Sequence, residues 1–357
     1  MPEKAVAKHP GTELKSLQYD LFTTFFGDTE ELSNTIELWD SIPKYNVSQR
    51  KQNILRKDGR LKVYEQHFVY ATRKDGKRVE TECFVAIQPA SIKIHGQYKD
   101  FYPSIDEELI EEVIRKIFAD QKCGMHNPTN VESWVWFSVQ MIRKELKTRG
   151  KTRSADEVKR SIEILSHTHI SLYLQGGREP IYSAPILSDV TRVTRQQYLD
   201  DTSQTWMARL PALLSKSVNE LTYRQFNYGV LMSFSTQLAR WLHKRLSHTY
   251  TNASMLDVYE ILFSTIKRDS ALLTYTRMGD NLRALEAALR ELTECHVLIF
   301  WERKQERREG RRLTDIKYAL TAHPDFVGGM KAANARLKDS RLALKAKIVD
   351  NSRLRGR

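Results

Sequence analysis

The chain of 357 residues has a formal net charge of +13, and 41% of its residues are hydrophobic. This apolar content indicates a globular protein and excludes a disordered one, while the length predicts two or three domains. The sequence contains no apolar run of about 18 residues, the length that a membrane-spanning helix needs, and no signal-peptide core follows Met1. We therefore expect a cytoplasmic protein. Its three cysteines are too widely spaced for a disulfide framework or a zinc ribbon.

Most of the positive charge lies near the C-terminal end. Residues 301–357 hold sixteen basic and seven acidic residues, which is +9 of the net +13. A localised positive field favours a phosphate-rich partner, because each neutralised phosphate releases condensed counterions. The alternative is that the charge serves solubility alone.

Residues 1–60 have no long hydrophobic period and are predicted to form an N-terminal arm and a linker. Within the arm, the pentapeptide QYDLF resembles the short motif by which bacterial proteins bind the sliding clamp. The resemblance implies an apolar pocket for Leu21 and Phe22 and an anchoring hydrogen bond for Gln18. The alternative is an arm that packs on its own chain.

Residues 61–200 are predicted to begin with a β-hairpin, since two-periodic runs flank Asp75-Gly76. Three helices follow in the pattern: one from a capping box at Ser104, one across 132–147, and one from a capping box at Ser154. A second hairpin then turns at Gly176-Gly177. Three helices followed by a hairpin is the order of a winged-helix domain.

The same order returns between residues 223 and 320. A shift of 127 residues places the apolar stripe of the third helix in the first copy on that of the second, and the strand after it also aligns. We therefore predict an α+β fold with two tandem winged-helix domains that carry β-hairpin wings. The predicted boundaries are 1–60 for the arm and linker, 61–200 and 201–327 for the two domains, and 328–357 for a basic helical tail.

The third helix of the second copy divides into an apolar stripe and a polar face. A helix that reads base edges in the major groove needs this division, whereas the alternative is a merely solvated face. The predicted base-reading side chains are Arg277, Asn281, Arg283 and Arg290.

The run WERKQERREGRR lies directly downstream, between two β-like segments. We interpret it as a wing tip that contacts phosphates or the minor groove. The predicted contacts are Arg303, Lys304, Arg307, Arg308, Arg311 and Arg312. Its counterpart in the first copy, LQGGREP, is nearly neutral.

Upstream, the helix LARWLHKRLSH is predicted to turn its leucines and Trp241 inward and its basic residues outward. The basic residues would then contact the DNA backbone, or simply face solvent. They are Arg240, His243, Lys244 and Arg245, of which the arginines and Lys244 are the predicted DNA contacts.

The pair His167 and His169 admits a second function, because alternating histidines can hold a metal in nucleases that nick DNA with a tyrosine such as Tyr198. The intervening Thr168 is polar, where such motifs have a bulky apolar residue, and this favours a structural role for the pair. No phosphate-cradling G-x-x-x-x-G-K-[ST] motif is present either. We therefore predict no catalytic residue, no metal and no cofactor.

The tandem order, the basic second wing and the stretches SNTIELWDSIPKY and LARWLHKRL resemble plasmid replication initiators of the iteron-binding Rep class. The resemblance implies a bacterial DNA-binding protein that binds direct repeats at an origin, promotes duplex opening and recruits the host initiator and the replicative helicase. It implies a main DNA contact from the second domain, with homodimerisation and an auxiliary contact from the first. The auxiliary residues would be Lys151, Arg153, Lys159 and Arg160. A winged-helix transcriptional regulator is the third hypothesis.

Overall fold

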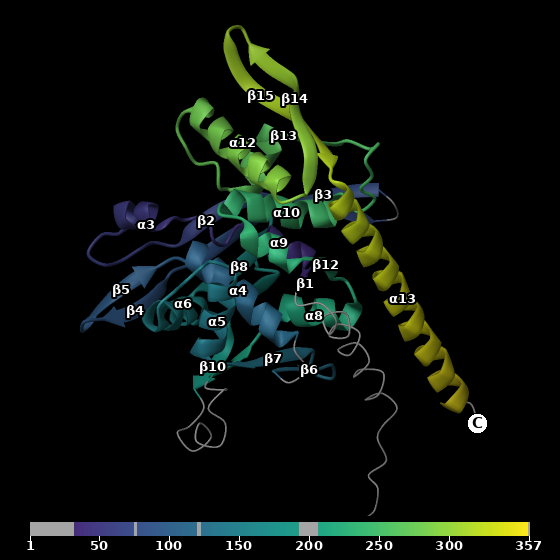
Figure 1. Cartoon of the computed structure of the whole chain (residues 1–357). Coiled ribbons are helices and arrows are strands. Elements are labelled where there is room, and N and C mark those ends of the chain that lie inside the picture. The colour runs from purple at the N-terminus through teal and green to yellow at the C-terminus, as the bar shows by residue number, and fades with distance from the viewer. Residues whose placement is uncertain (1–31, 75–76, 120–122, 193–205, 356–357) are drawn as a thin grey trace, which may run out of the picture.

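The computed structural model describes residues 32–74, 77–119, 123–192 and 206–355, which form a mixed α/β fold with antiparallel sheets (Figure 1). The buried apolar side chains gather mainly in two hydrophobic cores. The first core contains residues between 36 and 232, and the second core contains residues between 234 and 330. Within the described ranges, no helix combines the length and the apolar character that crossing a membrane requires.

Three helices, α4 to α6, pack in the first core against antiparallel sheets, of which the two larger ones have the strand orders β2-β3-β8-β9 and β10-β11-β7-β6. The elements of this part are β1 (Leu32–Thr35), α2 (Glu37–Ser41), α3 (Gln49–Leu55), β2 (Tyr64–Lys74), β3 (Lys77–Gln88), β4 (Ala90–Ile94), β5 (Gln97–Phe101), α4 (Ile105–Phe118), β6 (Gly124–Asn127), β7 (Glu132–Phe137), α5 (Val139–Thr148), α6 (Ala155–His167), β8 (His169–Leu174), β9 (Tyr182–Pro185), β10 (Ser188–Arg192), β11 (Trp206–Arg209), α8 (Ala212–Glu220), β12 (Arg224–Asn227) and α9 (Tyr228–Ser233).

The predicted hairpins of this part are confirmed. Strands β2 and β3 pair with Lys74 opposite Lys77, the register that a two-residue turn requires, and β8 pairs with β9. The capping box of α6 is also present: Glu157 N donates to Ser154 Oγ (3.2 Å), and Ser154 N donates to Glu157 Oε2 (2.7 Å). Local sequence chemistry therefore decides these strand pairings and this helix start.

The helix predicted across 132–147 is wrong in its first half. Residues 132–137 form strand β7, and the helix α5 begins only at Val139. Burial alternates along β7, with Val135 and Phe137 fully buried and Trp134 and Trp136 half-buried. Strands β6 and β11 pair with this aromatic segment on its two sides. Aromatic residues favour strands, and a helix could not form these backbone hydrogen bonds on both sides.

The predicted linker and the boundary at residue 200 also differ from the packing. Ile36, Trp39 and Val47 are buried in the first core, and Trp39 Nε1 donates a hydrogen bond to Glu111 Oε1 (2.5 Å). Strand β1 pairs with β12, and the core extends to Met232. The described residues 36–47 and 206–232 are therefore parts of the first core.

The second core lies beneath α10 (Gln237–Thr249), β13 (Tyr259–Leu262), α11 (Phe263–Ser270), α12 (Met278–Glu294), β14 (Leu298–Glu309), β15 (Arg312–Ala322) and the start of α13 (Pro324–Arg355). Its sheet has the order β13-β15-β14. The four leucines of the predicted apolar stripe on α12 are all buried here, so that prediction is confirmed; they are Leu282, Leu285, Leu289 and Leu292.

Strands β14 and β15 form a long hairpin that rises from the body, with α12 at its root (Figure 1). Glu309 pairs with Arg312, so the turn consists of two residues, and Gly310 has a φ of +59°. A two-residue hairpin turn needs a residue with positive φ, which glycine adopts without a Cβ clash. The wing-tip run is thus confirmed as a β-hairpin. On the other side of the second core, α13 runs away from the body toward the C-terminus.

Candidate nucleic-acid interface

Helix α12 presents arginines on the side opposite its leucines. Arg283 has a side chain that is 81% exposed, and Arg277 and Arg290 are exposed as well. Arg283 pairs with Asp280 one turn earlier, whereas Arg277 and Arg290 have no ion-pair partner among the described residues. The helix therefore places three guanidinium groups in solvent, where they can bind acceptors on a base edge or a phosphate.

The predicted role of Asn281 in base reading is wrong, because its side chain is buried. Its Oδ1 accepts from Tyr275 N (3.0 Å), and its Nδ2 donates to Tyr275 O (2.7 Å) and Arg277 O (3.1 Å). Asn281 thus holds the loop before α12 against the helix. Asn281 binds the backbone of Tyr275, and the Tyr275 side chain is 56% exposed beside the start of the helix. The sequence pattern did not predict this exposed aromatic side chain near Arg277.

Two ion pairs fix the root of the long hairpin against its neighbours. Arg303 on β14 donates to Glu286 of α12 (Nε–Oε1 2.8 Å), and the adjacent Lys304 pairs with Glu260 of β13. These hydrogen bonds raise the pKa of Arg303 and of Lys304, and the bond from Lys304 lowers the pKa of Glu260. Both cations were predicted DNA contacts, but here they orient the hairpin relative to α12.

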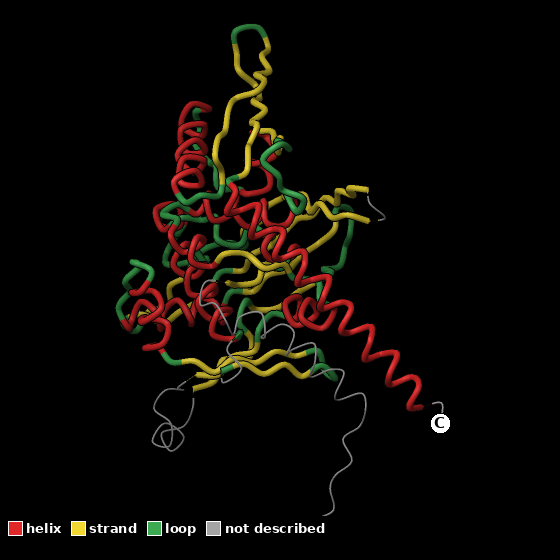
Figure 2. Tube along the Cα trace, turned by 45° about the vertical axis from the view of Figure 1, so that its right-hand side comes forward, coloured by secondary structure: helices red, strands yellow, loops and turns green. Residues whose placement is uncertain are grey.

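The end of the hairpin carries arginines that no acidic residue in the described part of the chain neutralises. Every residue from 302 to 312 is exposed, and the turn end of the hairpin stands clear of the rest of the molecule in both views (Figures 1 and 2). Arg308 pairs with Glu306 (2.7 Å). Arg307, Arg311 and Arg312 have no acidic partner among the residues that the structure describes. Glu306 binds Arg303 and Arg308, whereas the other three arginines of the run keep their guanidinium groups in solvent.

The prediction that the basic residues of α10 face outward is wrong. Arg240 is fully buried, and Lys244 and Arg245 have side chains that are 11% and 13% exposed. Arg240 Nη2 donates to Glu108 of α4 (2.9 Å), and Arg245 pairs with Asp269 of α11 (3.0 Å). These side chains cannot lie against DNA while they make these contacts.

Lys244 belongs to a buried ionic cluster between the two cores. Its Nζ lies 3.1 Å from Asp40 of α2 and also binds Glu112 of α4, while Arg115 binds Asp40 at 2.7 Å. Burial alone would lower the pKa of Lys244, but the Asp40 and Glu112 carboxylates outweigh burial and raise it. Burial would likewise raise the pKa of Asp40, yet Arg115 and Lys244 hold it well below its usual value. The cluster therefore stays charged and joins α2, α4 and α10.

His243, the fourth residue that was predicted to face outward, is buried among aromatic rings. It is 2% exposed and lies 5.6 Å from the ring of Phe234 and 5.7 Å from that of Phe226, between centroids. Burial, with a smaller contribution from Lys244, lowers its pKa to about 3. His243 is therefore neutral in the folded protein at neutral pH.

We expect this histidine to make the fold acid-sensitive. Unfolding restores a pKa near 6.5, so the unfolded chain binds more protons and stability falls as pH falls below that value, down toward pH 3. Between pH 6.5 and 5.5 the loss from this one group is about 1 kcal/mol of unfolding free energy. Urea unfolding of wild type and His243→Phe at both pH values measures it. The exposed His167→Phe is the control, and equal pH dependence in His243→Phe and wild type would contradict the assignment.

The auxiliary residues predicted in the first domain are largely engaged within the chain. Lys151 Nζ donates to Phe234 O (2.8 Å), and Arg153 binds Asp106 (2.6 Å). Lys159 is exposed and lies 3.7 Å from Asp156, and Arg160 is exposed on the same helix, α6. Of the four residues, only Lys159 and Arg160 are exposed enough to contact a phosphate of a bound partner. The neighbouring acidic residues of α6 offset their positive charge.

The remaining predictions concern the clamp-binding motif and the histidine pair with its candidate tyrosine. The clamp-motif residues Gln18, Leu21 and Phe22 and the tyrosine Tyr198 lie outside the described residues. His167 Nδ1 contacts Glu163 O (2.8 Å), and His169 Nε2 contacts Ser183 Oγ (2.8 Å). Neither belongs to a three-ligand group among the described residues.

Comparison with known proteins gives distant structural likenesses only. No protein-family model and no curated protein matches the sequence. A solved structure that resembles the chain is the crystal structure of Pi initiator protein in complex with iteron DNA, with 11% sequence identity and a TM-score of 0.40. The match covers 62% of this chain and 91% of that one. A likeness of this size establishes neither a common fold nor a common function.

Proposed function

We propose that this protein binds double-stranded DNA through α12 and the long hairpin and that it initiates plasmid replication from direct repeats at an origin. One observation carries the DNA-binding part of the proposal: three arginines that have no acidic partner among the described residues lie at the end of a hairpin whose root is bonded to α12. DNA offers a row of phosphates beside a groove that admits a helix. Arg307, Arg311 and Arg312 would bind the phosphates, while Arg277 at the start of α12 and Arg283 and Arg290 within it would face the groove.

The order of elements supports a winged-helix assignment for the second core. The chain runs α10, β13, α11, α12, β14 and β15, and the three strands pair in the order β13-β15-β14. In that assignment α12 is the third helix, which enters the major groove with its N-terminal residues toward the bases. Arg277 and Arg283, near the start of α12, are the base-reading side chains of the proposal.

The first core has the same sequence of helices but a different sheet arrangement. Helices α4, α5 and α6 precede the hairpin β8–β9, yet β8 also pairs with β3, while β7 lies in another sheet. The tip of β8–β9 carries a single arginine, Arg178. With so little positive charge, the tip of this hairpin is better suited to contact a protein than DNA. We propose that this part of the chain serves homodimerisation and an auxiliary DNA contact by Lys159 and Arg160.

The role in replication rests on the resemblance to iteron-binding initiators and includes recruitment of the host initiator, the replicative helicase and, through Gln18, Leu21 and Phe22, the sliding clamp. Its test is a footprint of the full chain on the DNA that flanks its gene. We expect protection of tandem repeats of about 17 to 22 base pairs, roughly two helical turns each. Protection of a single promoter palindrome would instead indicate a transcriptional regulator.

The footprinting reaction also tests the proposal that the protein binds DNA without cutting it. Supercoiled plasmid that carries the repeats should stay supercoiled when protein and a divalent metal are added. Nicking that disappears in the variant Tyr198→Phe would identify a tyrosine nuclease and overturn the proposal.

A further inference from the structure

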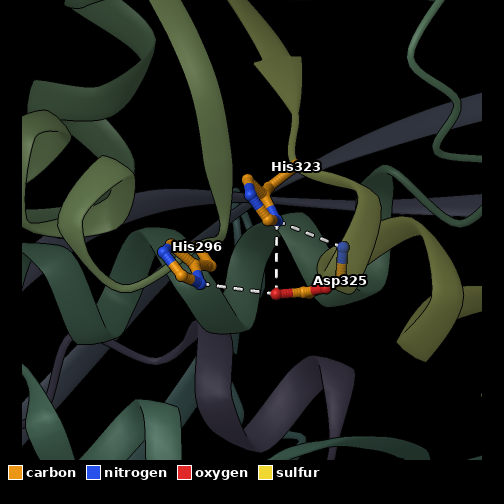
Figure 3. Close-up of side chains that lie close together, drawn as sticks. All are labelled: His296, His323 and Asp325. Carbon is orange, nitrogen blue, oxygen red and sulfur yellow. Dashed lines mark hydrogen bonds and ion pairs between the residues drawn. The ribbon is translucent and has the colours of Figure 1, made fainter.

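Two histidines and an aspartate meet at the root of the long hairpin (Figure 3). His296 lies in the turn between α12 and β14, His323 directly follows β15, and Asp325 is in the first turn of α13. Asp325 Oδ2 is 3.4 Å from Nδ1 of each imidazole. One ligand atom from each of the three side chains lies within 4.8 Å of the other two.

The backbone places the two imidazoles. His296 N donates to Thr293 O (3.2 Å), and His296 has a φ of +57°, a left-handed conformation that a residue with a Cβ seldom adopts. His323 N donates to Val297 O (3.0 Å), which ties the end of β15 to the start of β14. The rings stack with centroids 4.6 Å apart and an angle of 11°, so one ring must rotate about its Cβ–Cγ bond before both in-plane Nδ1 lone pairs point at one ion. The ligand atoms are therefore held close by the hairpin pairing and by the turn.

The contacts around His323 leave an electrostatic conflict. Asp325 N donates to His323 Nδ1 at 3.2 Å, so this nitrogen carries a lone pair, as metal coordination requires. The same nitrogen lies 3.4 Å from the Asp325 carboxylate, and two acceptors at this separation repel each other. A cation between them would turn the repulsion into attraction and would replace the long amide contact.

We propose that His296, His323 and Asp325 bind one divalent transition-metal ion, with zinc as the ion that fits best. Bonds of about 2.0–2.1 Å at the tetrahedral angle put two ligand atoms about 3.4 Å apart. Two of the three ligand separations already have that value. Two imidazoles and one carboxylate suit zinc better than magnesium or calcium, which prefer oxygen ligands.

The surroundings of the cluster fit such a site. The side chains of His296 and Asp325 are 65% and 70% exposed, so the ion can enter from solvent and keep water in its fourth position. The metal would join the turn after α12, the end of β15 and the first turn of α13. It would thus fix the long hairpin and α13 to the second core at one point, independently of any DNA contact.

The test uses the full chain without a histidine tag, stripped with a chelator and titrated with Zn²⁺ by calorimetry and with Co²⁺ by visible absorption. We expect one ion per chain and the absorption of a tetrahedral Co²⁺ centre. Removing two ligands in His296→Ala with His323→Ala should abolish saturable binding. Asp325→Asn should weaken it at least about tenfold, the least that loss of even an outer partner of a metal ligand costs.

The matched control removes two exposed imidazoles elsewhere, His67→Ala with His167→Ala, and should bind as wild type does. Unchanged affinity in the His296 and His323 double variant, or equal losses in both double variants, would overturn the proposal. Because a variant could unfold, hydrogen exchange of the wild-type chain provides an independent readout. Saturating Zn²⁺ should slow exchange at residues 323–327, and unchanged exchange there would also overturn it.

Discussion

Replacing Arg307, Arg311 and Arg312 with alanine should weaken DNA binding and flatten its dependence on salt. Each phosphate contact contributes about 0.9 to the slope of log affinity against log salt concentration, so three lost contacts remove about 2.7. Near physiological salt the affinity should fall roughly 100-fold. Fluorescence anisotropy with a labelled duplex over a series of KCl concentrations measures both quantities. The three side chains were chosen because they are exposed and, within the ranges that the structure describes, have no acidic partner, unlike Arg308.

A control of equal charge separates a local contact from a general effect of net charge. Lys57, Lys93 and Lys216 are exposed and belong to the first part of the chain, away from the long hairpin. Their triple alanine variant loses the same three charges and should keep the wild-type slope to within about one contact, or 0.9. If the salt-dependence slope falls equally in both triple variants, the arginines of the hairpin do not bind DNA more than other surface cations do. A wild-type slope in the hairpin variant would remove its tip from the interface.

Arg240→Ala should destabilise the fold strongly. Its guanidinium is fully buried and binds Glu108 Oε2 at 2.9 Å and Phe234 O at 3.1 Å. Truncation leaves the buried Glu108 carboxylate without its main partner, which lowers the unfolding free energy by about 3–5 kcal/mol. Replacing both partners, in Arg240→Met with Glu108→Gln, should cost much less, because no buried charge is then left unpaired. Urea denaturation of the three proteins measures the differences.

The comparison with Arg283→Ala distinguishes a buried structural arginine from a DNA contact. Arg283 is 81% exposed and pairs only with Asp280, so its loss should change stability by no more than about 0.5 kcal/mol. It should instead weaken DNA binding. A stable Arg240→Ala protein with reduced DNA affinity would contradict the burial of α10's basic face and restore the original sequence interpretation.

The error over α10 shows what a single amphipathic pattern leaves open. Leu238, Leu242 and Leu246 are buried in the second core as the pattern predicts. The opposite face was taken as solvent-exposed, but α2 and α4 from the first core cover it and supply Asp40, Glu108 and Glu112. Those acids lie more than a hundred residues upstream. A helix's own sequence cannot show that a second element packs on its polar side.

Asn281 illustrates the same limit at a smaller scale. An asparagine in the first turn of α12 is equally compatible with a base-reading side chain and with one that binds the backbone nearby. Its three hydrogen bonds to Tyr275 and Arg277 decide for the second. The loop conformation that makes these bonds possible depends on how α11 and α12 pack, which local pattern does not specify.

By itself the sequence determined the features that depend on neighbours along the chain. These are the capping boxes, the pairing of β2 with β3, the hairpin turn at Gly310, the leucine stripe of α12 and the basic tip of the long hairpin, because hydrogen bonds and side-chain periods over a few residues govern them. Only the tertiary structure decided which cations are free. Pairing of β14 with β15 brings His323 beside His296, and packing of the two cores buries Arg240 and Lys244 while Arg307 stays in solvent. The sequence shows where the charged residues are, but whether a charge is neutralised depends on acidic residues that the fold brings close from distant segments of the chain.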